Sequence, residues 1–245
     1  MKVSIITATF NSASTVADTI RSVQQQTYQN IEHIIIDAVS KDNTLEIVRS
    51  MHQGIIISEK DKGIYDAMNK GIAFASGGII GILNSDDFYA DKNIIEKIVD
   101  LFQSTNCDAV YGDLLYVDYN DLSKIKRKWI SGAHSIRSFL YGWMPPHPTF
   151  FVKKEVYEKL GGFNLQLGSA ADYELMLRFI FKEKIKLSYL NEVIVKMRTG
   201  GVSNKNLSNR LMANKNDKLA WKINNLRPFW FTTILKPLRK IVQFI

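Results

Sequence analysis

The sequence predicts an α/β protein with a mostly parallel central sheet and helices on both faces. Through the first hundred residues, short β-rich apolar runs alternate with helical patterns. Alternation at this spacing requires right-handed crossovers, which set the strands parallel and cover both faces of the sheet. The chain has 245 residues, 46% of them hydrophobic, which is enough to bury such a core.

Each element is predicted from its own stretch of sequence. Strands are predicted at 3–7, 31–37, 54–58 and 79–83, and helices at 14–26, 44–52, 65–75 and 93–102. After residue 107, strand-like stretches at 109–119 and 123–130 predict a small antiparallel hairpin. A strand at 149–152 and helices at 154–160 and 171–181 follow.

The excess positive charge lies at the end of the chain. Residues 1–204 hold 23 basic and 23 acidic side chains, whereas 205–245 hold nine basic ones and one acid. We therefore divide the chain into a main domain at 1–204 and a basic amphipathic helical tail at 205–245. The neutral body with acids at its rim would repel phosphates, so we expect no nucleic-acid partner.

The composition of the tail bears on where the protein works. Its basic residues are interleaved with aromatic and aliphatic ones, a pattern typical of a helix lying on an anionic membrane surface. The alternative is that this apolar face packs on the domain or on a second subunit. With a single cysteine, no secretory signal and no apolar run of spanning length, we expect a cytoplasmic protein, peripheral at the inner face of the cell membrane.

Acidic residues collect at the carboxyl ends of the predicted strands, where parallel sheets bind ligands. They are Asp37, Asp61 and the pair Asp86-Asp87. Acids on one rim repel each other unless a cation or a hydrogen-bond donor lies among them. Oxygen-only ligands suit Mg²⁺ or Mn²⁺, so we predict a metal site at Asp86 and Asp87. The alternative is a helix cap or a solvated turn.

The neighbouring strand ends predict contacts with a nucleoside. Asp37 can accept from a base imide nitrogen or from ribose hydroxyls, although helix capping is its alternative role. Asp61 is placed to reach the nucleoside, and Gly63 permits close backbone approach. Asn69 follows within the next helix.

One further carboxylate is a candidate general base. Asp172 and Glu174 are two residues apart, so on a helix they point in nearly opposite directions and cannot share a site. Asp172, at the start of the helix, is the better candidate to take a proton from an acceptor hydroxyl. The alternative is an acid that only stabilises the helix N-terminus.

Taken in order, these motifs resemble family 2 glycosyltransferases, in particular bacterial enzymes of polysaccharide assembly of the colanic-acid or capsule kind. The resemblance rests on residues 4–11, Asp37, residues 61–71, residues 84–87 and Asp172. It implies a GT-A fold and transfer, with inversion at the anomeric carbon, from a UDP-, GDP- or dTDP-sugar to a hydroxyl of a saccharide or lipid-linked acceptor.

The resemblance also assigns roles to individual residues. It implies nucleoside contacts from Thr7, Phe10, Asn11, Asp37 and Asp61, ribose or metal contact by Asp86, metal ligation by Asp87, and Asp172 as the base. Trp143 and His147 match a segment on the acceptor side.

The sequence departs from the family pattern at three places. Ala38 and Val39 stand where the family usually has glycine or serine, so that turn must form without glycine. Asn84 replaces a further Asp, and Ala171 replaces the Glu of a common Glu-Asp pair.

Other function classes fit less well. A sugar nucleotidyltransferase needs a Gly-rich phosphate loop after the first strand, and a dinucleotide dehydrogenase needs Gly-x-Gly-x-x-Gly there; neither motif occurs. A non-catalytic sugar-nucleotide-binding protein is the alternative that the sequence leaves open.

Overall fold

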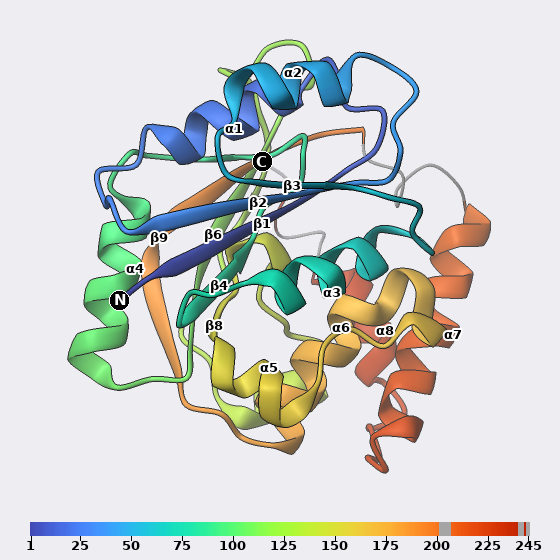
Figure 1. The fold of residues 1–245 in the computed structure, drawn as a ribbon. Coiled ribbons are helices and arrows are strands. Elements are labelled where there is room, and N and C mark those ends of the chain that lie inside the picture. Colours follow the sequence, from blue (N-terminus) through green and yellow to red (C-terminus); the bar gives the residue numbers. More distant parts are fainter. Residues whose placement is uncertain (201–206, 240–242, 244–245) are drawn as a thin grey trace.

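One sheet runs through the molecule, with strand order β3-β2-β1-β4-β8-β6-β9-β5 and β7 paired to β6 (Figure 1). The structure is a computed structural model, and it describes residues 1–200, 207–239 and 243. Its strands are β1 Val3–Thr9, β2 Ile31–Asp37, β3 Ile55–Ser58, β4 Ile79–Ile82, β5 Phe88–Tyr89, β6 Ala109–Val117, β7 Ile125–Trp129, β8 Phe151–Lys153 and β9 Leu187–Arg198.

The helices alternate with these strands through the first half of the chain and then cluster. The α-helices are α1 Val16–Gln24, α2 Thr44–Met51, α3 Ile64–Phe74, α4 Ile94–Thr105, α5 Lys154–Leu160, α6 Ala171–Met176, α7 Leu207–Ile223 and α8 Thr232–Leu238. Short 3₁₀ segments are η1 Ile136–Tyr141, η2 His147–Thr149 and η3 Leu165–Ala170, and the π-helical η4 Leu177–Lys182 continues α6.

Strands β1 to β4 form the parallel half of the sheet, as predicted. Strand β1 pairs in parallel with β2 and β4, and β2 pairs in parallel with β3. The register sets Thr9 opposite Asp37 and Asp37 opposite Ser58, so the carboxyl ends of these strands meet at one edge. That edge carries the predicted acids.

Helices cover both faces of the parallel strands because successive strand residues point to opposite sides. Ile35 packs with α1 and α2 on one face, whereas Ile34 and Ile36 pack with α3 on the other. Gly71 lets α3 approach β1 closely, since a Cβ there would lie 2.3 Å from the Ile6 side chain. Figure 1 shows α1 and α2 on one side of strands β1 to β3 and α3 on the other.

The second half of the sheet is mixed and differs from the sequence prediction in one respect. The predicted hairpin is present as β6 and β7, which pair antiparallel. Strand β9, twelve residues long, pairs in parallel with β6 and was not predicted. Its central Asn191 and Glu192 are exposed and interrupt the apolar pattern, which divides the strand signal into two short pieces. Because the long pairings are parallel, the predicted mostly parallel sheet is confirmed.

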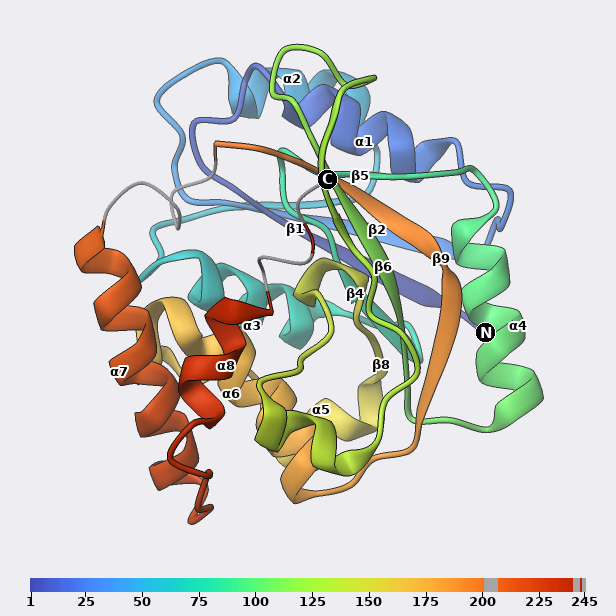
Figure 2. The same cartoon turned by 180° about the vertical axis from the view of Figure 1, so that it is seen from behind.

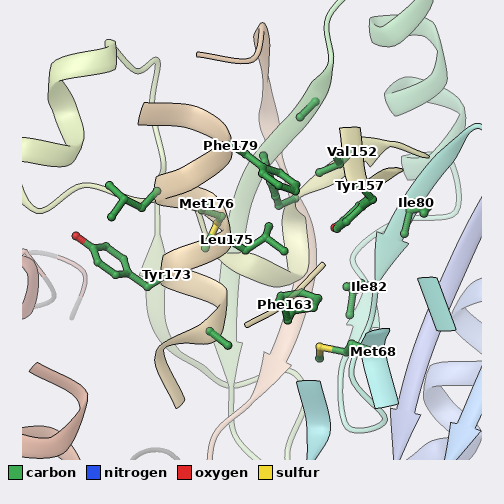
Figure 3. Close-up of a cluster of buried hydrophobic side chains, with 14 of the residues drawn as sticks. Met68, Ile80, Ile82, Val152, Tyr157, Phe163, Tyr173, Leu175, Met176 and Phe179 are labelled. Atoms are coloured by element: carbon green, nitrogen blue, oxygen red, sulfur yellow. The ribbon is translucent and has the colours of Figure 1, made fainter. Parts of the chain in front are cut away.

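The helix that carries Asp172 is fixed by a large apolar cluster. Figure 3 shows Leu175, Met176 and Phe179 facing Ile82 of the sheet and Met68 of α3. All five side chains are buried. The start of α6 is therefore held beside the edge where the strands end.

The C-terminal helices pack onto the domain and do not form a separate tail. Trp221 of α7 is fully buried, and its Nε1 donates to the Tyr173 hydroxyl at 2.8 Å. Thr232 of α8 donates through Oγ1 to the Leu140 carbonyl at 2.7 Å. Figure 2 shows α7 and α8 beside α6. The predicted boundary at residue 204 lies outside the described residues. No helix within 1–200 or 207–239 combines the length and apolar character needed to cross a membrane.

Candidate active site

The ends of β1 to β4 and the loops after them form the acidic edge, made of residues 9–11, 37–40, 58–63 and 84–87. Asp37 lies at its centre, fully buried. Its carboxylate accepts from the Ser40 backbone at 3.1 Å, the Ser40 hydroxyl at 2.5 Å and the Ser58 hydroxyl at 2.7 Å. These donors fix the carboxylate and compensate for burial of its charge.

The turn after Asp37 forms without glycine, as the sequence required. Val39 adopts the left-handed conformation at φ 59°, which is strained for a β-branched residue. Asn11, also left-handed at φ 50°, holds this turn from the neighbouring strand. Its Oδ1 accepts from the Lys41 backbone at 2.8 Å, and its backbone donates to Ser40 Oγ at 2.9 Å. Asn11 thus joins the loops after β1 and β2.

Phe10 and Thr7, near the end of β1, differ in how exposed their side chains are. Phe10 is 55% exposed and presents its ring at the acidic edge. Thr7 is fully buried, and its hydroxyl is 3.0 Å from His33 Nε2. It lies on the face covered by α1 and α2, two residues short of the edge. The Thr7 side chain is thus enclosed by protein in this structure, and its predicted nucleoside contact stays a prediction.

The loop before α3 contains two further predicted residues. Asp61 Oδ1 accepts from the Gly63 backbone at 2.9 Å, which closes a tight turn. Gly63 has φ 112° and leads into α3, and no atom lies within 4 Å of where its Cβ would be. The turn therefore needs glycine for its conformation, and it leaves open space at the edge.

Asn69 has a structural role that the sequence did not reveal. Its Nδ2 donates to the Phe163 carbonyl at 2.9 Å, and its Oδ1 accepts from the Phe163 backbone at 2.8 Å. A Cβ on Gly162 would lie 2.3 Å from the same Oδ1, so the loop before η3 sits directly on this side chain. Because both its polar atoms are engaged, Asn69 ties α3 to that loop in this structure, and its predicted ligand contact stays a prediction.

Asp86 and Asp87 lie just after β4, and their environments differ. Asp87 is fully buried, and its Oδ2 accepts from Asn84 Nδ2 at 2.9 Å. Its Oδ1 has no hydrogen-bond partner among the described residues. Burial, with the Asp86 charge adding to it, raises the pKa of Asp87 well above its usual value. Burial also raises the pKa of the partly exposed Asp86.

This pair fits a hard divalent cation in the chemistry of its donors. A buried carboxylate oxygen without a partner is costly, and a bound cation would relieve that cost. Within the described residues, no group of three or more acidic, histidine or cysteine side chains could hold a metal. Two carboxylates suffice for Mg²⁺ or Mn²⁺ when phosphate oxygens and water supply the other ligands. Asp86 and Asp87 are the residues that would hold such an ion.

Arg198 completes the acidic edge and was missed by the sequence reasoning. It ends β9, is 4% exposed, and donates to the Asp86 carbonyl at 2.6 Å and to Asp18 Oδ2 at 2.5 Å. Its positive charge lowers the pKa of both Asp86 and Asp87, against the larger effect of burial. Only a prediction of β9 could have signalled it, since Arg198 belongs to no motif.

Asp172 lies in the first turn of α6, as predicted, and its Oδ1 accepts from the Tyr173 backbone at 2.7 Å. Burial raises the pKa of Tyr65, and the charge of Asp172 raises it further. Burial lowers the pKa of His147, which the Asp172 charge partly opposes. Asp172 therefore lies within electrostatic reach of both side chains.

Glu174 is excluded as the base by its contacts. It is 2% exposed, and its Oε1 accepts from Arg178 Nε at 2.8 Å and from Asn224 Nδ2 at 2.9 Å. This buried, fully paired carboxylate joins α6 to α7. Of the two acids, only Asp172 keeps a partly exposed carboxylate.

Tyr116 of β6 connects the two parts of the site. Burial raises its pKa; the positive charge of Arg127 lowers it, and the charges of Asp87 and Asp172 raise it. The guanidinium of Arg127 lies 4.5 Å from the Tyr116 ring centroid. Tyr116 is therefore within electrostatic reach of both the metal pair and the candidate base. We call Asp172 with Tyr65, Tyr116 and His147 the α6 side of the site.

Comparison with known proteins agrees with this geometry. The model of "Glycosyl transferase family 2" matches residues 4–163. An uncharacterized glycosyltransferase of Mycobacterium tuberculosis is 34% identical over 180 residues, covering 72% of this chain and 68% of that protein. A PGL/p-HBAD biosynthesis glycosyltransferase of the same species is 26% identical over 208 residues, covering 82% and 78%.

Solved structures show the same fold at low identity. S. aureus TarS 1-349 in complex with UDP-GlcNAc superimposes with a TM-score of 0.71 at 16% identity, over 96% of this chain and 69% of that one. The mannosyltransferase PcManGT from Pyrobaculum calidifontis, in complex with GDP-Man and Mn²⁺, gives 0.67 at 18% identity, over 96% and 68%. A longer TarS structure is covered over 41% of its length. The predicted GT-A fold is confirmed, and the chain belongs to glycosyl transferase family 2.

Proposed function

We propose that the protein is a metal-dependent, inverting glycosyltransferase that moves a sugar from a nucleotide-diphosphate donor to an acceptor hydroxyl. The observation that carries the proposal is the buried Asp87 carboxylate with one unpartnered oxygen, beside Asp86 and on the same edge as Asp37. Such an arrangement is stable when a cation and a diphosphate join it.

The donor lies along the acidic edge in this proposal. Phe10 offers an exposed ring, Asp37 an oriented carboxylate, and Asp61 a carboxylate in a tight turn. The UDP-GlcNAc complex of TarS and the GDP-Man complex of PcManGT support a nucleotide-sugar donor. Metal held by Asp86 and Asp87 would neutralise charge on the departing diphosphate.

Asp172 acts as the general base. It takes the proton of the acceptor hydroxyl while that oxygen forms a bond to the anomeric carbon. The bond from this carbon to the diphosphate breaks on the opposite side, so the configuration inverts. The π-helical continuation of α6 and the apolar cluster beneath it hold the Asp172 backbone in place.

The C-terminal helices suit an acceptor held at a membrane. Trp230 is 84% exposed, and Phe229, Ile234 and Leu238 are about half exposed beside it. Tyr141 of η1 adds its ring, 6.3 Å from that of Phe229. Aromatic and aliphatic side chains among basic residues match an anionic membrane surface. We include a lipid-linked acceptor of cell-surface polysaccharide synthesis, at the cytoplasmic face of the membrane, in the proposal.

A thermal-shift screen of UDP-, GDP- and dTDP-sugars with and without Mn²⁺ tests the donor and the metal together. We expect one nucleotide class to raise the melting temperature, and to do so strongly only with metal. A metal-independent shift would contradict the assigned metal role. Turnover with the same donor separates the enzyme from a non-catalytic nucleotide-binding protein.

Sedimentation with anionic vesicles tests the membrane surface. Because Trp221 belongs to the core, truncation of the tail is unsuitable, and point variants are preferable. The pair Phe229→Ser and Trp230→Ser should abolish binding, whereas Phe74→Ser, which removes a half-exposed ring from α3, should not. Equal behaviour of all variants would contradict the membrane contact.

A further inference from the structure

A cavity between β7, the loop after η1 and α8 is lined by basic and aromatic side chains. The cavity has a volume of about 200 Å³ and is partly open to solvent. Among the described residues, the charged side chains that line it are Lys128, Lys236 and Arg239, and none of them is acidic. The cavity volume is below the roughly 300–1,000 Å³ of sites that enclose a whole small molecule, so there is room for only part of a ligand.

The basic side chains are not all neutralised by the protein. Lys236 pairs with Asp217 at 2.8 Å. Lys128 and Arg239 are exposed and form no ion pair within the described part of the chain. Two cations therefore face the cavity with their charge unbalanced, which favours an anionic ligand.

The aromatic wall is rigid. Trp143 is 7% exposed, and its Nε1 donates to the Ser131 carbonyl at 2.9 Å. Its ring stacks on His134 at 5.2 Å between centroids and meets Tyr111 edge-on at 5.6 Å. Trp129 lines the cavity from β7. Fixed aromatic faces beside a few polar groups suit a ligand with both an apolar ring face and charge.

The wall formed by α8 is fixed by close backbone packing. Gly142 has φ 73°, and a Cβ there would lie 2.5 Å from the Lys236 backbone nitrogen. This contact requires glycine and brings α8 against the loop after η1. The cavity is therefore part of the folded domain.

Two residues that line the cavity, Lys236 and Gln243, contact neighbours of the α6 side of the site. Lys236 Nζ lies 3.7 Å from the ring centroid of Tyr173, the residue after Asp172. On the other wall, Gln243 Oε1 accepts from Arg127 Nε at 2.8 Å, and Arg127 covers Tyr116. Lining residues therefore contact Tyr173, which follows Asp172 in α6, and Arg127, which covers Tyr116 on the α6 side of the site.

We propose that this cavity binds the phosphate-bearing part of the acceptor, as a sugar phosphate or sugar diphosphate, with the anion at Lys128 and Arg239. The proposal rests on the proposed glycosyltransferase function. The shared chemistry is a phosphate ester next to a sugar ring, carried either by a membrane lipid or by a soluble molecule.

Fluorine NMR of protein labelled with 5-fluorotryptophan tests this site, because the chain has four tryptophans in different settings. Inorganic pyrophosphate is added in EDTA, so that no divalent metal is present. We expect the Trp129 and Trp143 signals, assigned with Trp→Phe variants, to shift saturably. The fully buried Trp221 serves as the internal reference.

Charge variants supply the decisive comparison. The double variant Lys128→Gln/Arg239→Gln should weaken pyrophosphate binding at least about tenfold, since two charged contacts are lost. The matched variant Lys218→Gln/Lys222→Gln, on exposed positions of α7, should bind unchanged. Unmoved Trp129 and Trp143 signals, or equal affinity in the two double variants, would overturn the proposal.

Two further probes distinguish the source of the phosphate. Tighter binding of farnesyl diphosphate than of glucose 1-phosphate assigns the site to a membrane-borne acceptor, and the reverse order assigns it to a soluble one; both support the site. Donor binding with Mn²⁺ is measured in parallel. If the protein binds the donor but shows no response to pyrophosphate, only this inference is refuted. If it responds to pyrophosphate but does not bind the donor, the donor assignment is refuted.

Discussion

The acidic edge and the α6 side of the site are held together in different ways. At the acidic edge, short turns hold the carboxylates: Ser40 donates to Asp37 and Asn84 donates to Asp87, each from three residues away. Ser58 and Arg198 add bonds from more distant positions. On the α6 side, partners are distant, with Glu174 and Asn224 separated by 50 residues. Changes at the acidic edge should therefore affect ligands, whereas changes around α6 should affect stability as well.

The largest expected effect separates chemistry from binding on the α6 side. Asp172→Asn keeps the size of the side chain but removes the base, so turnover should fall about 10³-fold, within the usual range for a general base. Donor affinity in the presence of Mn²⁺ should stay within about twofold. Full turnover in this variant would show that another group takes the proton; Asp100→Asn, at an exposed position on α4, is the control.

Two tryptophans near the C-terminus, Trp221 in α7 and Trp230 in the turn before α8, test the stability side of the comparison. Trp221→Ala removes a fully buried ring and its bond to Tyr173, which should lower the free energy of unfolding by about 3–5 kcal/mol. Trp230→Ala, at an 84% exposed ring, should change it by less than about 0.5 kcal/mol. Urea denaturation measures both, and similar values would contradict the packing of α7 as part of the domain.

At the acidic edge, function and stability should oppose each other. The raised pKa of Asp87 means that its ionised form is disfavoured in the folded protein. Stability is therefore fully present below the unfolded pKa and is lost as pH rises toward the folded pKa. Asp87→Asn should remove this pH dependence and stabilise the metal-free protein by about 0.5–2 kcal/mol at neutral pH. The same variant should no longer be stabilised by Mn²⁺ and donor. Thermal unfolding between pH 4 and 8 checks the sign.

The smallest expected effect lies in the turn after β2. Val39→Gly relieves a strained left-handed conformation, offset by the greater freedom of glycine in the unfolded chain. We expect a net stabilisation of about 0.5–1 kcal/mol. Ala38→Gly, next to it without a positive φ, should destabilise by a similar amount. If Val39→Gly lowers the free energy of unfolding, the contacts of the valine side chain stabilise the protein by more than its left-handed backbone conformation destabilises it.

The same contrast explains what the sequence could predict. The parallel strands, their helices and the acids after them are encoded locally, since Ile-rich runs and polar strand ends follow one another along the chain. Asn69 and Thr7 lie within those motifs, yet their roles depend on Phe163 and His33, which no spacing rule connects to them. Strand β9, with Arg198 at its end, carries a β-rich run at 193–195 but is interrupted by Asn191 and Glu192, and it pairs with β6 from far along the chain.

A crystal structure with Mn²⁺ and the stabilising nucleotide sugar tests the central claim most directly. The account predicts an anomalous peak about 2.0–2.3 Å from a carboxylate oxygen of Asp87, bridged to the diphosphate, with Asp86 beside it. Manganese and diphosphate bound away from both carboxylates, with Asp87 still buried and unliganded, would contradict it.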